Sequence, residues 1–99
     1  MSFAIIFTKS AGREIQRERA WLITNRGRVA ADAFEDELAH ALDLLEECPA
    51  MGAPSPWSDE ERRVFLRGCR YHVYYRLYAD EARILIVRIR HEKQAPFKG

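Results

Sequence analysis

The sequence predicts a two-layer α+β domain, in which a helical hairpin packs on a small, mainly antiparallel sheet. Three observations predict this class. A short apolar run opens the chain, two segments with helical spacing follow it, and from residue 63 onward apolar side chains recur at every second position. Because 99 residues allow one domain, the expected element order within it is β-α-α-β-β-β.

The first two elements are expected to be a strand and a helix. The apolar, β-branched segment from Phe3 to Thr8 predicts the strand. Ser10 can then cap a helix that runs to about Gly27, where a glycine favours termination. The apolar stripe of this helix consists of Ile15, Leu22 and Trp21.

The second helix has the clearest pattern in the chain. Five apolar residues share one helical face, acidic residues cover the remainder, and Pro49 ends the helix. Residues 49–57 hold three prolines and a glycine, which predicts a loop. The apolar stripe consists of Phe34, Leu38, Ala41, Leu42 and Leu45.

Residues 62–67, 70–78 and 82–91 are expected to form three strands, with turns at Gly68–Cys69 and at residues 79–81. The last strand is a candidate for an exposed edge. Alternation assigns the side chains to two faces. Those directed at the helices are Val64, Leu66, Tyr71, Val73, Tyr75, Leu77, Leu85, Val87 and Ile89. Those on the opposite face are Arg63, Phe65, Arg67, Arg70, His72, Tyr74, Arg76, Ile84, Ile86, Arg88 and Arg90.

Charge is strongly segregated along the chain, although its net value is only +1. Residues 1–28 carry six basic and two acidic side chains, residues 29–61 carry ten acidic ones and no Lys or Arg, and residues 62–93 carry nine basic and three acidic ones. Opposed blocks of this kind predict one electropositive and one electronegative face.

Composition narrows the classes of protein that fit. No apolar run is long enough to span a bilayer, and the N-terminus does not resemble a signal peptide, so a cytoplasmic protein with no membrane partner is expected. Cys48 and Cys69 are widely spaced and form no CxxC, so both are expected to be free thiols. No metal and no cofactor are expected.

Several segments together resemble one bacterial family. They are "AWLITNRG" at the end of the first helix, the L-x-x-C-P-A-M-G pattern at the end of the second, the strand region "RRVFLRGCRYHVYYRLYADEARILIVRIRH" and the following "HEKQAP". In this order they resemble the RelE/ParE superfamily of type II toxin–antitoxin systems, over roughly residues 3 to 96.

The resemblance implies a small toxin of a plasmid-stabilisation (addiction) system that a cognate antitoxin binds and neutralises. RelE-like members cut messenger RNA on the ribosome, whereas ParE-like members poison DNA gyrase and are not nucleases. Because "VRIRHEKQAP" resembles the ParE side, growth inhibition through DNA gyrase is the preferred function. The alternatives are a ribosome-dependent mRNA endonuclease (an mRNA interferase) and a non-toxic nucleic-acid-binding module.

Each alternative assigns roles to residues of the open sheet face. Metal-independent RNA cleavage needs an acid or base and cations that stabilise the charged phosphate, and the residues available for it are Arg63, Arg67, Arg88, Arg90 and His91. The residues expected to contact the target or the antitoxin are Arg67, Arg70, His72, Tyr74, Arg76, Arg88, Arg90 and Lys93. The expected assembly is either a homodimer or a toxin–antitoxin hetero-oligomer.

Overall fold

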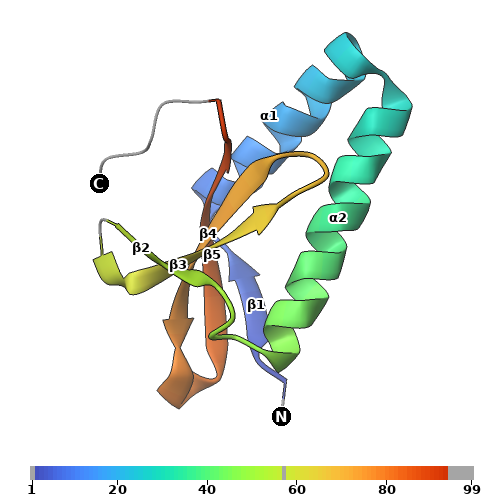
Figure 1. Cartoon of the computed structure of the whole chain (residues 1–99). Coiled ribbons are helices and arrows are strands. Elements are labelled where there is room, and N and C mark those ends of the chain that lie inside the picture. The colour runs from blue at the N-terminus through green and yellow to red at the C-terminus, as the bar shows by residue number, and fades with distance from the viewer. Residues whose placement is uncertain (1, 57, 94–99) are drawn as a thin grey trace.

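The structure, a computed structural model, describes residues 2–56 and 58–93 and confirms the two-layer α+β class (Figure 1). The order within the described residues is β-α-α-β-β-β-β, one strand more than expected, because a short strand forms in the proline-rich segment. The elements are β1 (Ala4–Phe7), α1 (Lys9–Arg26), α2 (Arg28–Glu47), β2 (Ala53–Ser55), β3 (Ser58–Leu66), β4 (Tyr71–Tyr78) and β5 (Arg83–His91), with a 3-10 turn at Ala79–Glu81.

The helical hairpin starts earlier than the sequence predicts, and the connection between its helices is shorter. Thr8, rather than Ser10, caps α1: its Oγ1 accepts a hydrogen bond from the N–H of Ala11 at 3.0 Å. Gly27 ends α1 as expected, with a φ of 93° that favours glycine. Because α2 begins at the next residue, Gly27 alone joins the two helices.

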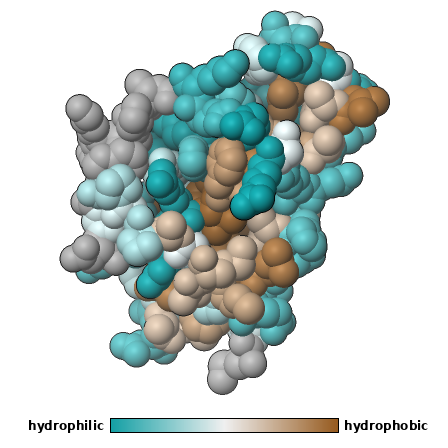
Figure 2. All heavy atoms as spheres, in the orientation of Figure 1, coloured by the Kyte–Doolittle hydropathy of each residue, from teal (hydrophilic) through white to brown (hydrophobic). Residues whose placement is uncertain are grey.

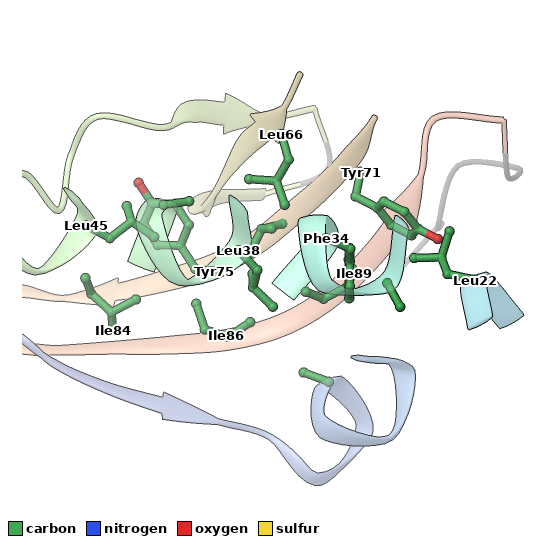
Figure 3. Packing of buried hydrophobic residues seen from close by; sticks show 14 residues of the cluster. Leu22, Phe34, Leu38, Leu45, Leu66, Tyr71, Tyr75, Ile84, Ile86 and Ile89 are labelled. Carbon is green, nitrogen blue, oxygen red and sulfur yellow. The ribbon is translucent and has the colours of Figure 1, made fainter. Parts of the chain in front are cut away.

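The core lies between the hairpin and the sheet. In α2, Phe34, Leu38, Ala41 and Leu45 are buried as expected, and Leu42 is half-buried. In α1, Leu22 is buried and Ile15 packs against the core, but Trp21 is 49% exposed and does not belong to the stripe. Figure 3 shows the α2 side chains against Tyr71, Tyr75 and the isoleucines of β5.

The sheet places the last strand in its interior. Its order is β1-β5-β4-β3-β2, with β1 parallel to β5 and the other pairs antiparallel. The expectation of an exposed edge for β5 is therefore wrong. The chain returns through the helical hairpin so that β1 pairs with β5 from Ala4–Arg83 to Phe7–Ile86.

A β-bulge in β5 changes which side chains face the helices. Tyr74 pairs with Arg88 and Tyr75 pairs with Ile86, so Val87 is an extra residue at the register shift. The predicted alternation is consequently wrong before the bulge: Ile84 and Ile86 are fully buried in the core, and the expected helix-facing residue Leu85 lies opposite Arg76 instead. After the bulge, Arg88, Ile89 and Arg90 have the predicted orientations.

The segment before β3 is anchored rather than irregular. Ala53 and Pro54 of β2 pair with β3, where the sequence predicts only a loop. The Tyr75 hydroxyl accepts a hydrogen bond from the N–H of Gly52 at 3.0 Å and donates one to the carbonyl of Pro49 at 2.7 Å. These contacts position the short edge strand. Trp57 lies outside the described residues.

Apolar side chains reach the surface where α2 leads into the following loop. Leu44 and Met51 are each 44% exposed. Figure 2 shows brown and tan atoms gathered over this region, while hydrophilic atoms cover much of the remaining visible face. Neither α1 nor α2 is both long and apolar enough to cross a membrane.

Candidate functional site

The sheet has one face that α1 and α2 do not cover, which we call the open face. Residues directly opposite each other on neighbouring strands lie on the same face, so the register defines it. Its side chains form three rows across β3, β4 and β5. These rows are Phe65–His72–Arg90, Arg63–Tyr74–Arg88 and Glu61–Arg76–Leu85. The open face therefore gathers Arg63, Arg76, Arg88 and Arg90 around two aromatic side chains, as alternation predicted.

His72 occupies the middle of the first row. Its ring centroid lies 4.7 Å from that of Phe65 and 6.2 Å from that of Tyr74. Its Nδ1 atom is buried, and the part of the chain that the structure describes offers this atom no hydrogen-bond partner. Burial lowers the pKa of His72, and the positive charge of Arg63 lowers it further. The imidazole is therefore mainly neutral at pH 7.

The arginines of the open face differ in how they are neutralised. Arg76 lies 3.9 Å from carboxylate oxygens of both Glu60 and Glu61, in the third row. The Nη1 atom of Arg88 lies 3.9 Å from Glu14 Oε2. Among the side chains that the structure describes, which do not include that of Asp59, no carboxylate lies within 4.0 Å of Arg63. Arg63 therefore differs from Arg76 and Arg88, which each lie within 4.0 Å of a described carboxylate.

Three residues expected to contact a partner lie at the end of the sheet instead of within the rows. Arg67 is exposed in the turn after β3, and Lys93 is exposed just after β5. Arg70 forms an ion pair with Glu92, and its Cζ lies 5.6 Å from the ring centroid of Phe65. Arg70 therefore borders the first row, while Arg67 and Lys93 lie beyond the ends of the strands.

His91 is directed away from the open face. It pairs with the core residue Tyr71 in the register, and the two ring centroids lie 5.0 Å apart in an edge-on arrangement. Its Nδ1 atom accepts a hydrogen bond from the N–H of Lys93 at 3.1 Å. Of the residues available for RNA cleavage, the structure brings together Arg63, Arg88 and Arg90, but it separates His91 and Arg67 from them.

Two carboxylates of α1, which the sequence analysis did not single out, hold the end of the sheet. Glu14 Oε1 accepts a hydrogen bond from the N–H of Ile89 at 3.0 Å, beyond the last pair of β1 with β5. Glu18 Oε1 accepts one from the Tyr71 hydroxyl at 2.7 Å. Burial, together with this bond, raises the pKa of Tyr71. Glu14, Glu18 and the buried Leu22 follow one another at four-residue spacing along one face of α1, and that periodicity was the available signal.

Glu37 of α2 fixes the turn that carries Arg67 and Arg70. Its carboxylate accepts hydrogen bonds from the N–H groups of Gly68 at 2.9 Å and Cys69 at 2.8 Å. Burial opposes ionisation of Glu37, but these bonds outweigh burial, so its pKa is lowered. Burial and the adjacent Glu37 raise the pKa of the Cys69 thiol to about 12. Cys48 and Cys69 are both free, as predicted.

Comparison with known proteins places this arrangement in a family. Residues 5–96 match the family model described as the ParE toxin of the type II toxin–antitoxin system parDE. Comparison with curated protein sequences gives no match.

Solved structures show the same fold at low sequence identity. A chain of the chromosomal ParDE toxin–antitoxin system of P. aeruginosa has a TM-score of 0.74 and 16% identity, with 91% of this chain and 96% of that chain covered. A mutant E. coli RelE toxin in the free state has a TM-score of 0.68 and 15% identity, with 94% and 86% covered. A chain of the RelBE2 toxin–antitoxin complex of Mycobacterium tuberculosis has a TM-score of 0.64 and 19% identity, with 93% and 100% covered.

The solved structures establish the fold, and the family model covers nearly all of the sequence. The resemblance to the RelE/ParE superfamily is thereby confirmed. The chain belongs to the ParE toxin family of type II toxin–antitoxin systems.

Proposed function

We propose that this toxin inhibits growth by binding DNA gyrase through the open face and that a cognate antitoxin neutralises it in the cytoplasm. The match to the ParE model supports gyrase as the target. The orientation of His91 is the observation that favours binding over RNA cleavage. Its ring contacts Tyr71 on the helix-facing side, so it does not join Arg63, Arg88 and Arg90 around a common reacting group.

The open face has the features of a protein-binding surface. Arginine and tyrosine are the residues that most often carry binding energy at interfaces, especially where neighbouring side chains exclude water. Here Tyr74 is only 4% exposed at the centre of the rows, and the arginines beside it on β3 and β5 are half-buried. A partner that brings acidic groups to the first two rows would meet cations whose solvation is already reduced, which strengthens the interaction.

RNA cleavage is the second candidate, and His72 is the observation that favours it. A mainly neutral imidazole can accept the proton of an attacking 2′-hydroxyl, and neighbouring guanidinium groups can stabilise a charged phosphate. His72 lies directly opposite Arg90 and next to the row of Arg63 and Arg88. In this candidate His72, rather than His91, would be the general base.

Two assays on the purified full chain separate these candidates. One measures supercoiling by purified DNA gyrase, and the other measures ribosome-dependent cleavage of mRNA. We expect inhibition of supercoiling and no cleavage. Arg63→Ala should weaken the inhibition by about tenfold or more, because interface arginines commonly contribute this much. Arg83→Ala is the matched control, since Arg83 pairs with Glu81 at the far end of the sheet.

The opposite results would overturn the proposal. Cutting of mRNA at defined codons, with loss of cutting in His72→Gln, would establish the nuclease candidate. Normal growth after induced expression without the antitoxin would favour a non-toxic nucleic-acid-binding module instead.

A further inference from the structure

We propose that two copies of this chain associate through the outer edge of β1, by antiparallel pairing of the two β1 strands across a two-fold axis. The partner that fits this edge is therefore a second copy of the same chain. The two sheets would join into one continuous sheet, because β1 is the terminal strand of each. This association is independent of the target proposed above.

The backbone of β1 has hydrogen-bonding groups that no described residue satisfies. The N–H of Ala4 donates to the carbonyl of Ala82 at 2.9 Å, in the parallel pairing of β1 with β5. Because alternate residues of a strand bond the neighbour on one side, the N–H and carbonyl groups of Ile5 and Phe7 point to the outer edge. Within the described residues these outer groups have no hydrogen-bond partner.

The two edges of the sheet differ in how they are protected against pairing with another chain. At the opposite edge, β2 has three residues, contains Pro54 and has a register shift before Ser55. A short length, a proline and a bulge are features that prevent an edge strand from pairing. In contrast, β1 has the sequence Ala-Ile-Ile-Phe, with no charge, no proline and no register shift. Of the two described edge strands, β1 is therefore the one that can accept another strand.

The side chains of β1 leave apolar surface on both sides of the sheet. Ile6 and Phe7 are each 40% exposed. Ile6 lies opposite Leu85 on the open-face side, whereas Phe7 lies opposite the core residue Ile86 on the helix-facing side. A second β1 strand would cover both side chains, and the burial of their apolar area favours association.

One register of the two strands satisfies the outer backbone groups. If Ile5 lies opposite Phe7 of the second copy, each opposed pair can exchange both of its N–H···O bonds. Ile6 then lies opposite Ile6 of the second copy, at the two-fold axis. The alternative places Ile5 opposite itself, and it therefore places Phe7 opposite Phe3. That register is less favourable, because the N–H of Phe3 is already bonded to the carbonyl of Glu46 at 3.1 Å.

The charges at the two ends of β1 favour the same arrangement. The Glu47 carboxylate lies beside the start of the strand, where it accepts a hydrogen bond from the Ser2 hydroxyl at 3.3 Å. Lys9, which is exposed, follows the end of the strand as the first residue of α1. Antiparallel pairing places the start of one strand beside the end of the other, so Glu47 of each copy would approach Lys9 of the other. This complementarity favours a second copy over a segment of uniform charge.

The strand pairing also determines how the two copies face. The two-fold axis of an antiparallel strand pair is perpendicular to the sheet, so both helical hairpins would lie on one side and both open faces on the other. The dimer would therefore present two open faces on one surface. Because only a short strand and its flanks meet, the interface is small and the dimer should dissociate on dilution.

Sedimentation velocity of the purified full chain, without antitoxin, measures this association over about 1–100 μM. We expect monomers at the low end and dimers at the high end. Ile6→Lys should raise the dissociation constant by about tenfold or more, because two ammonium groups would meet at the axis. Val29→Lys is the matched control and should associate like the original. Val29 is 85% exposed at the start of α2, whereas Glu47 lies at its end.

A charge exchange distinguishes the proposed pairing from unspecific association. Lys9→Glu and Glu47→Lys should each weaken the dimer, because each brings like charges together. The double variant should restore it, since opposite charges meet again. Ile6→Cys in a Cys48→Ser background, which removes the exposed native thiol, should form an intersubunit disulfide at position 6. Thermal unfolding establishes that each variant is folded.

Opposite results would overturn the proposal. They are a monomer at every concentration up to about 100 μM, undefined larger aggregates, or a folded Ile6→Lys that associates like the original. Weaker antitoxin binding by Ile6→Lys, with self-association unchanged, would assign the edge to the antitoxin instead. The gyrase assay is separate: a dimer that behaves as described but does not inhibit gyrase would contradict only the proposed target.

Discussion

The helix-covered face and the open face belong to the same strands, but one polar atom on each face has opposite surroundings. On the covered face the hydroxyl of Tyr75 has two hydrogen bonds, to Gly52 and Pro49. On the open face, the Nδ1 atom of His72 has no hydrogen-bond partner within the described residues. The comparison distinguishes Tyr75, whose hydroxyl stabilises the fold, from His72, which we propose belongs to a partner-binding surface.

The largest expected difference between the faces concerns two phenylalanines. Phe34 is fully buried in α2 against Tyr71, with ring centroids 4.8 Å apart, whereas Phe65 is 36% exposed on the open face. Phe34→Ala should lower the free energy of unfolding by about 3–5 kcal/mol, because it leaves a cavity in the core. Phe65→Ala should lower it by less than about 1 kcal/mol. Urea denaturation measures both, and equal losses would contradict the division.

Two glycines sharpen the comparison at the loop that the Tyr75 hydroxyl anchors. A Cβ at Gly52 would lie 2.6 Å from Tyr75 Oη and 2.8 Å from the carbonyl oxygen of Arg63, whereas a Cβ at Gly12 would meet nothing within 4 Å. Gly52→Ala should therefore destabilise the chain by about 1–3 kcal/mol. Gly12→Ala, in α1, should stabilise it by about 0.5–1 kcal/mol. Thermal unfolding gives the signs, and a stabilising Gly52→Ala would show that the loop is not held as described.

A smaller effect is expected where α2 holds the turn between β3 and β4. Glu37→Gln should reduce the free energy of unfolding by about 1–2 kcal/mol near neutral pH. The carboxylate has two charged oxygens for the two backbone N–H groups, whereas the amide has a single uncharged carbonyl oxygen. The folded-state pKa of Glu37 is lowered, so its contribution is present above the unfolded-state pKa and is lost as pH falls through the folded-state value.

The difference between the original chain and Glu37→Gln should accordingly narrow in acid. Asp36→Asn, an exposed neighbour on α2, is the control and should change stability little. Denaturant unfolding across the acid range provides the measurement. A constant difference at every pH would mean that the charge of Glu37 does not stabilise the turn.

Periodicity predicted the fold because most of its elements have one clear apolar face. The stripe of α2 and the alternation in β4 each specify one orientation. In β5 the pattern fails at "ILIV", residues 84–87, because consecutive apolar residues fit either face. Only pairing with β4 reveals the bulge at Val87. Similarly, β2 depends on the distant Tyr75 hydroxyl, and no local pattern records that contact.

The sequence predicted which side chains of β3, β4 and β5 share the open face, but it did not predict their contacts. Alternation placed Arg63, His72, Arg88 and Arg90 on one face, since each lies where the strand pattern is clear. The buried state of His72 Nδ1 and the neutralisation of Arg76 by Glu60 and Glu61 depend on side chains of neighbouring strands and the strand end. Sequence periodicity gives no such distances.

Growth inhibition by the double variant Arg63→Ala/Arg90→Ala, measured with its thermal unfolding temperature, most directly tests whether the open face serves binding rather than folding. The antitoxin is left out of the expression strain. We predict that the variant no longer inhibits growth, while its unfolding temperature stays within about 4 °C of the original, a shift equivalent to no more than about 1 kcal/mol. A folded double variant that inhibits growth as strongly as the original, or one that fails to fold, would contradict this assignment.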